Sequence, residues 1–129
     1  MANNVGHSTV LLLGTQNDAG SITGVSDAQS SLPVAMGGYA PFTIYFESVG
    51  TTSGGTLKIE EAVYNANKQT IYTGTWSQIG SDVSASSFTG TAQLAVHIAN
   101  TCVSHLRVRI SADITGGGTV IVRLVRQDS

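Results

Sequence analysis

The sequence predicts an all-β protein, folded as a β-sandwich or a jelly roll of about 8–10 short antiparallel strands. Apolar and polar residues alternate with a period of two in several segments, as side chains do on a half-buried strand. Clusters of Gly, Pro, Asn, Asp and Ser interrupt these segments about every ten residues, which is typical of turns between short strands. No segment favours a long helix.

The first third of the chain contains two strand candidates, STVLLLG (8–14) and GSITGV (20–25). The polar stretch TQNDAGS separates them and predicts a turn. Residues 1–7, MANNVGH, are expected to form a flexible N-terminal arm. Pro33 in SLPVAM indicates an edge strand or an irregular segment, because proline cannot donate a hydrogen bond to a neighbouring strand.

The middle third opens with FTIYFES, in which Phe42, Ile44 and Phe46 fall on one face. KIEEAVYNANKQ is the best helical candidate, but it also fits a strand followed by a polar turn. That strand would run through Leu57, Ile59, Glu61 and Val63. The segment TIYTGTW is a further strand candidate, and residues 77–90, SQIGSDVSASSFTG, are predicted to form a long polar loop.

Three strands are predicted in the last third. Their inward-facing residues are expected to be Leu94, Val96 and Ile98; Leu106, Val108, Ile110 and Ala112; and Val120, Val122 and Leu124. The last strand also has apolar residues on its other face, as expected where a second surface covers it. The glycine runs TSGGT and TGGGT each precede a strand rich in β-branched residues and predict hairpin turns.

Composition favours a single domain over residues 1–129. Hydrophobic residues make up 41% of the chain, which is too many for a disordered protein, and charged residues make up only 11%. A net charge of −2 gives no field that attracts nucleic acid or an anionic membrane. One cysteine, Cys102, fits a reducing compartment. So little repulsive charge suggests an assembly subunit.

Four of the six basic residues lie between residues 104 and 127: Arg107, Arg109, Arg123 and Arg126. Arg107 and Arg109 are two residues apart and share one face of a strand, and Arg123 is expected close to them across a hairpin. Such a cluster could bind phosphates or a protein partner. We favour ion pairs with carboxylates of the same sheet, with a protein interface as the alternative. The candidate carboxylates are Glu47, Glu60, Glu61 and Asp113.

No catalytic, metal or cofactor site is expected. His97, Cys102 and His105 bracket a turn, but three candidate ligands at this spacing match no zinc motif and lack the arrangement of a nucleophile with its base. Trp76 is the only tryptophan and is expected to be a core or interface anchor. With Tyr72 nearby, contact with a sugar is the alternative. The protein is therefore expected not to be an enzyme.

The second half of the chain resembles small β-sandwich virion proteins of tailed bacteriophages. Four segments carry the resemblance: GTLKIEEA (55–62), WSQI (76–79), HLRVRISA (105–112) and GTVIVRL (118–124). In such proteins an Asp-Gly turn often precedes the tryptophan, whereas this chain has NANKQ and a further strand there. Residues 1–50 have no counterpart in this pattern.

The resemblance implies a structural subunit, with head decoration or cement proteins as the nearest type. It implies a homodimer or homotrimer that binds the major capsid protein or another virion protein, in virions assembled in the host cytoplasm. Neither nucleic acid nor membrane is an expected partner. A tail, neck or receptor-binding subunit and a carbohydrate-binding module are the alternatives. The candidate interface residues are Trp76, Arg107, Arg109, Arg123 and Arg126, together with the N-terminal arm.

Overall fold

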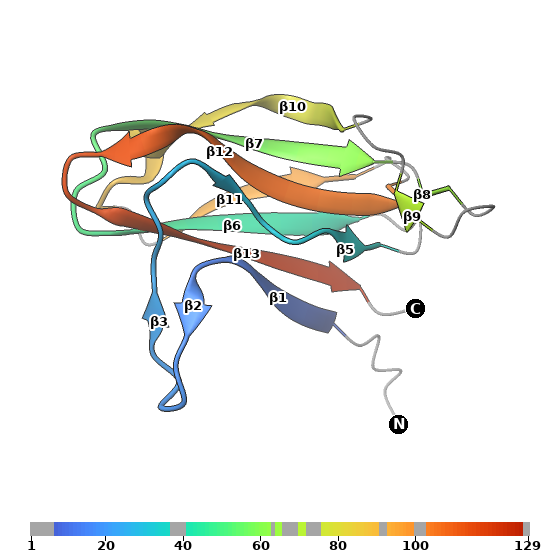
Figure 1. Cartoon of the computed structure of the whole chain (residues 1–129), viewed down its shortest axis with the longest axis horizontal. Coiled ribbons are helices and arrows are strands. Elements are labelled where there is room, and N and C mark those ends of the chain that lie inside the picture. The colour runs from blue at the N-terminus through green and yellow to red at the C-terminus, as the bar shows by residue number, and fades with distance from the viewer. Residues whose placement is uncertain are drawn as a thin grey trace.

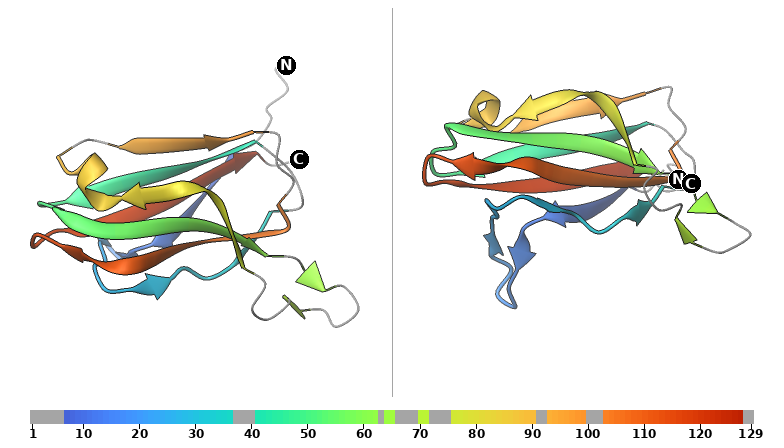
Figure 2. Two further views of the ribbon diagram at one scale, coloured as in Figure 1. Left: turned by 90° about the horizontal axis from the view of Figure 1, so that it is seen from above. Right: turned by 45° about the horizontal axis from the view of Figure 1, so that its top comes forward.

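The chain forms a sandwich of two antiparallel sheets, seen as two layers in Figure 2. The computed structural model describes residues 7–36, 41–62, 64–65, 70–71, 76–90, 93–99 and 103–127. The four-stranded sheet has the order β1 (His7–Leu13), β13 (Thr119–Gln127), β6 (Phe42–Val49) and β11 (Leu94–Ile98). The five-stranded sheet has β10 (Ser77–Ser84), β7 (Gly54–Ala62) and β12 (His105–Thr115), followed by β4 (Gln29–Ser30) and β5 (Val34–Ala35), which both pair with β12.

These nine strands confirm the predicted all-β sandwich. Two further ladders of two-residue strands lie outside the sheets: β2 (Thr15–Gln16) with β3 (Ile22–Thr23), and β8 (Tyr64–Asn65) with β9 (Thr70–Ile71). The described residues also include one short 3-10 helix, η1 (Ala85–Phe88). No helix among the described residues has the length and apolar character needed to cross a membrane.

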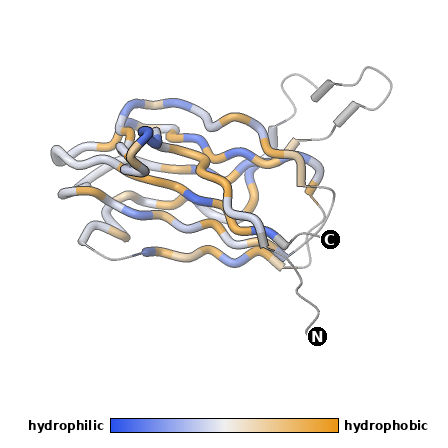
Figure 3. The backbone as a smooth tube through the Cα atoms, turned by 90° about the horizontal axis from the view of Figure 1, so that it is seen from below, coloured by the Kyte–Doolittle hydropathy of each residue, from blue (hydrophilic) through white to orange (hydrophobic). Residues whose placement is uncertain are grey.

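The core lies between the sheets and follows the predicted alternation along most strands. Hydrophobic and hydrophilic residues follow one another along the strands in Figure 3, because successive side chains point to opposite faces. The inward-facing residues of β6 and β13 are at most 2% exposed: Phe42, Ile44, Phe46, Val120, Val122 and Leu124. On β11, Leu94, Val96 and Ile98 are partly buried and pack against this core.

The prediction that Ala112 faces the core is wrong. Leu106, Val108 and Ile110 are buried as predicted, but Ala112 is exposed. The pairing of β12 with β7 shifts register between Ile110 and Ala112, so a bulge turns this residue outward. The core resumes at Ile114, which is 7% exposed.

The two glycine-rich connections cross between the sheets and are not hairpin turns. β6 and β7 lie in opposite sheets, and so do β12 and β13. Both crossings lie at the left-hand end of the sandwich in Figure 1 and are hydrogen-bonded to each other. Ser53 N donates to Thr115 O and Gly118 N to Thr51 O, each at 2.8 Å. A Cβ atom at Gly118 would lie 2.5 Å from Thr51 O, so only glycine fits there.

Residues 77–88 form strand β10 and helix η1, so the prediction of a long polar loop over residues 77–90 is wrong. Ile79 and Val83 of β10 both face the core, whereas Ser81, which lies between them with the same parity, is exposed. The register against β7 shifts between them, and this irregularity hides the period of two from the sequence. Phe88 of η1 is fully buried, with its ring centroid 5.7 Å from that of Phe46.

The hairpin β2–β3 interrupts one edge of the four-stranded sheet. Strand β1 pairs with β13, and Val25 pairs with Val120 further along β13. The residues between them leave the sandwich and project beyond the β1 edge (Figure 1). Asn17 orders the tip, because its Oδ1 accepts hydrogen bonds from the backbone N–H groups of Ala19 and Ser21 at 3.0 and 2.9 Å.

Candidate functional site

The outer face of β10, β7 and β12 brings together the charged and aromatic residues that the sequence singled out. Register places Gln78 of β10, Glu60 of β7 and Arg107 of β12 side by side, and Arg109 beside Lys58. Residues at alternate positions of a strand share a face, so these side chains all point away from the core. We call Trp76, Lys58, Glu60, Gln78, Asp82, Arg107 and Arg109 the outer-face cluster.

Glu60 is the centre of this cluster. The residue is only 6% exposed although it lies on the outer face, because both arginines close over it. Arg107 Nε donates to Glu60 Oε1 at 2.8 Å. Arg109 donates from Nε at 3.2 and 3.3 Å to the two carboxylate oxygens, and from Nη2 at 3.3 Å to Oε2. The prediction that the arginines form ion pairs with carboxylates of the same sheet is therefore confirmed for Arg107 and Arg109.

The pKa of Glu60 is lowered from its ordinary value of 4.5. Burial alone raises this pKa, since it disfavours the charged form. The hydrogen bonds from Arg109 and Arg107, together with their positive charges, outweigh burial and favour the carboxylate. The buried group is thus a charged acceptor that fixes two guanidinium groups.

Trp76 is part of the same arrangement. The guanidinium carbon of Arg107 lies 4.1 Å from the centroid of the indole ring, which is the geometry of a cation–π contact. The indole is half-buried, and Arg107 occupies one of its two faces. A sugar cannot stack on the face that Arg107 occupies. Tyr72, the proposed second stacking residue, lies outside the described residues.

A second polar network borders this centre. Lys58 Nζ lies 2.7 Å from Asp82 Oδ1, and Gln78 Nε2 donates to the same oxygen at 2.7 Å. The hydrogen bond from Lys58, then that from Gln78, lowers the pKa of Asp82. The outer-face cluster contains three cations and two carboxylates, so its formal charge is 3 − 2 = +1. This network was missed in the sequence because residues 77–90 were predicted to be a loop.

The expected position of Arg123 beside Arg107 and Arg109 is wrong. Strand β13 lies in the opposite sheet from β12, so Arg123 faces outward on the other side of the sandwich. There it forms an ion pair with Glu47 of β6, one of the carboxylates predicted as a partner. The predicted basic ribbon is therefore divided between two faces.

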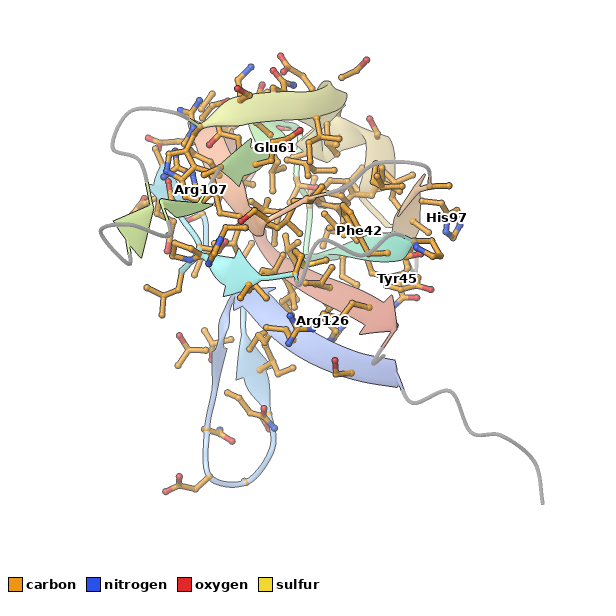
Figure 4. The ribbon with its side chains drawn as sticks, turned by 90° about the vertical axis from the view of Figure 1, so that its right-hand side faces the viewer. Phe42, Tyr45, Glu61, His97, Arg107 and Arg126 are labelled. Atoms are coloured by element: carbon orange, nitrogen blue, oxygen red, sulfur yellow. The ribbon has the colours of Figure 1, made fainter. Side chains whose placement is uncertain are left out.

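Arg126 belongs to neither face. It lies on the same side of β13 as the core residues Val122 and Leu124. At this end of the sandwich its side chain contacts both sheets. Its Nε donates to Ser8 Oγ at 3.2 Å, and its Nη1 donates to the carbonyl oxygen of Ala35 on β5. This end of the sandwich, with Arg126 labelled, faces the viewer in Figure 4.

The two histidines lie on strands of different sheets, His97 on β11 and His105 on β12. His97 Nδ1 is 2.9 Å from Thr43 Oγ1, and His105 Nδ1 is 3.0 Å from Ser104 Oγ. Figure 4 shows His97 on the opposite flank of the molecule from Arg107. Cys102 lies outside the described residues. Across the described ranges, no three His, Cys, Asp or Glu residues are grouped to hold a metal ion.

Comparison with known proteins gives a likeness in structure but none in sequence. No family model and no curated protein sequence matches this chain. Among solved structures, the chain is similar to the SPBc2 prophage-derived protein YomS, with 9% sequence identity and a TM-score of 0.49. The similarity covers 95% of this chain and 94% of that one.

Proposed function

We propose that this chain is a non-enzymatic structural protein of a bacteriophage virion. Its specific role would be that of a capsid decoration, or cement, subunit, which bridges major capsid proteins and stabilises the head. The resemblance of four sequence segments to tailed-phage virion proteins supports this. Those segments occupy β7, the start of β10, β12 and β13, so they make up much of the sandwich.

The outer-face cluster is the observation that carries the proposal. Trp and Arg are the residue types most enriched where protein interfaces concentrate their binding energy. Here Glu60 and the indole ring of Trp76 already hold Arg107 in one position. A partner that binds this face therefore does not have to immobilise a free arginine, which lowers the entropic cost of association.

The charge of the cluster favours a protein partner over nucleic acid. Nucleic-acid binding draws its affinity from many unneutralised cations that displace counterions. In this cluster the carboxylates of Glu60 and Asp82 neutralise two of the three cations. A nearly neutral face with a half-buried aromatic ring resembles the core of a protein interface.

The mechanism would be mechanical. Each subunit would join neighbouring capsid proteins, so that internal pressure must separate additional interfaces before the shell opens. Persistent interfaces bury about 1,200–2,000 Å² in total, which one face of a small sandwich can supply together with the neighbouring loops.

The test uses heads of the encoding phage that were assembled without this chain. Purified protein is mixed with the heads and sedimented, and we expect it to co-sediment. Trp76→Ala should weaken this binding about tenfold or more. Tyr45→Ala is the matched control, because Tyr45 is a half-buried aromatic residue on the outer face of the opposite sheet.

The outcomes separate the alternatives. Absence of wild-type protein from the pelleted heads would exclude decoration. Co-sedimentation with tails instead would favour the tail or neck role. Binding to a glycan array that is lost in Trp76→Ala would favour the carbohydrate-binding module. Equal loss of head binding in Trp76→Ala and Tyr45→Ala would place the interface elsewhere.

A further inference from the structure

A groove opens along one flank of the sandwich, between β1 of one sheet and the segment that carries β4 and β5 of the other. Its cavity volume is about 400 Å³. The apolar lining includes Val10, Leu12, Leu13, Val25 and Val34. The remaining lining residues are uncharged, so the groove offers neither a cation nor a carboxylate to an occupant.

An apolar side chain projects from the same flank. Leu32 lines the groove and is 84% exposed. Among the described residues only one other large hydrophobic side chain is exposed, Val49 at 52%. Leu32 and the apolar recess adjoin, so they form one contiguous apolar surface, and contiguous exposed apolar patches mark interaction sites.

Strand β1 forms the open edge next to this groove. Within the described part of the chain it pairs with β13 alone, so its other edge has no strand partner. Natural sheet edges are protected from other chains by charges, prolines, bulges or shortness. β10 carries Asp82 and a bulge, and β4 and β5 have two residues each around Pro33. β1 shifts register against β13 between Leu11 and Leu13, but residues 7–11 pair without interruption and include no proline, lysine or carboxylate.

We infer that a second copy of this chain docks on this flank, with the two β1 strands antiparallel across a two-fold axis. The flank is self-complementary, since it presents an open strand edge, a projecting leucine and an apolar recess side by side. A two-fold axis would place Leu32 of each copy against the groove of the other. No charged residue lines the groove or lies on β1, so two copies meet there without like-charge repulsion.

This inference concerns self-association alone and does not depend on binding to a capsid. Sedimentation velocity of the purified full chain, from low to high micromolar concentration, gives the oligomeric state without any other virion component. We expect a monomer–dimer equilibrium. Hydrogen exchange at the backbone amides of β1 should slow as the dimer forms, because they gain partners.

Two substitutions test the surface, each with a matched control. Leu32→Ser removes the projecting side chain and should raise the dimer dissociation constant about tenfold. Val49→Ser, which removes the other exposed apolar group, should leave it unchanged. Thr9→Lys puts a charge on the exposed side of the β1 edge and should also weaken the dimer. Gln93→Lys adds the same charge next to β11 and should have no effect.

Three outcomes would overturn the inference. The wild-type protein could stay monomeric throughout the concentration range. It could form a trimer or an open polymer, which a two-fold interface does not produce. A dimer could form that Leu32→Ser and Thr9→Lys leave intact. Because Leu32 and Thr9 are exposed, both variants should keep the wild-type thermal midpoint at concentrations where every form is monomeric, and Thr9→Lys provides a test independent of Leu32→Ser.

Discussion

Arg107 and Glu60 lie opposite each other on neighbouring strands, with 2.8 Å between Arg107 Nε and Glu60 Oε1. The carboxylate is nearly inaccessible, whereas the arginine side chain keeps 21% of its exposure. The carboxylate of Glu60, shielded from water, therefore stabilises the sheet as a hydrogen-bond acceptor. The guanidinium group of Arg107 remains partly exposed at the surface. Substituting one residue of this pair at a time can therefore separate its contribution to the stability of the sheet from its contribution to partner binding.

Glu60→Gln keeps the size of the side chain and removes its charge. Both arginines then lose a charged acceptor, and hydrogen bonds to charged groups contribute about 1.5–3 kcal/mol each. The arginines can turn toward water, so we expect the free energy of unfolding to fall by about 1.5–3 kcal/mol in total. Urea denaturation measures this change. Asp82→Asn, at an exposed ion pair, should cost clearly less, and an equal loss would contradict the central role of Glu60.

Acid should remove the contribution of Glu60. Its folded-state pKa is lowered from 4.5, so the stabilisation is fully present above that value. It is lost as the pH falls below 4.5 and through the lowered folded-state pKa, where the folded protein takes up the proton. Denaturation of wild type and Glu60→Gln across this range should show the difference between them shrinking toward low pH. A difference that stays constant would refute the assignment.

Phe88→Ala should be among the most damaging substitutions. The side chain is fully buried against Phe46, and truncating a buried phenylalanine costs about 3–5 kcal/mol because a cavity remains. Ser87→Ala changes an exposed residue of the same short helix and should shift stability by less than about 0.5 kcal/mol. Thermal denaturation of the pair decides whether η1 belongs to the core or is a dispensable loop.

Thr52→Val tests how η1 is attached to the first crossing between the sheets. Thr52 is fully buried, and its Oγ1 donates to the carbonyl oxygen of Ala85 at 2.9 Å. Valine keeps the shape but leaves this buried oxygen without a donor, at a cost of about 1–3 kcal/mol. Thr51→Val, at the exposed neighbouring position, is the control. Equal denaturation midpoints for the two variants would show that the hydrogen bond is not needed.

The sheets were predictable where strand pairing is regular. Phe42, Ile44 and Phe46 alternate without interruption, and all three are buried. Prediction failed at the bulges, where extra residues locally break the alternation of inward and outward side chains. Ala112 was assigned to the core for this reason. In β10 the register shift between Ile79 and Val83, where Gly80 has a φ of 72°, leaves Ser81 exposed and concealed the strand in the same way.

The site was predictable in its chemistry but not in its arrangement. Ion pairing of the arginines with Glu60 and Glu47 follows from opposite charges on alternating strands. The separation of Arg123 from Arg107 could not be predicted, since glycine-rich turns serve both hairpins and crossings between sheets. Contact between Trp76 and Arg107 also depends on β10 pairing beside β7, which is a non-local choice.

The two glycine-rich crossings have a consequence for how the molecule folds. Each sheet draws strands from both halves of the chain, because the four-stranded sheet joins β1 to β13 and the five-stranded sheet joins β4 to β12. The long loops must close, at an entropic cost, before distant strands can pair. This cost slows folding, and it makes the folding of distant parts of the chain interdependent. Severing the backbone anywhere between β6 and β12 would leave each piece with incomplete layers, and the two pieces would have to associate to regain a native core.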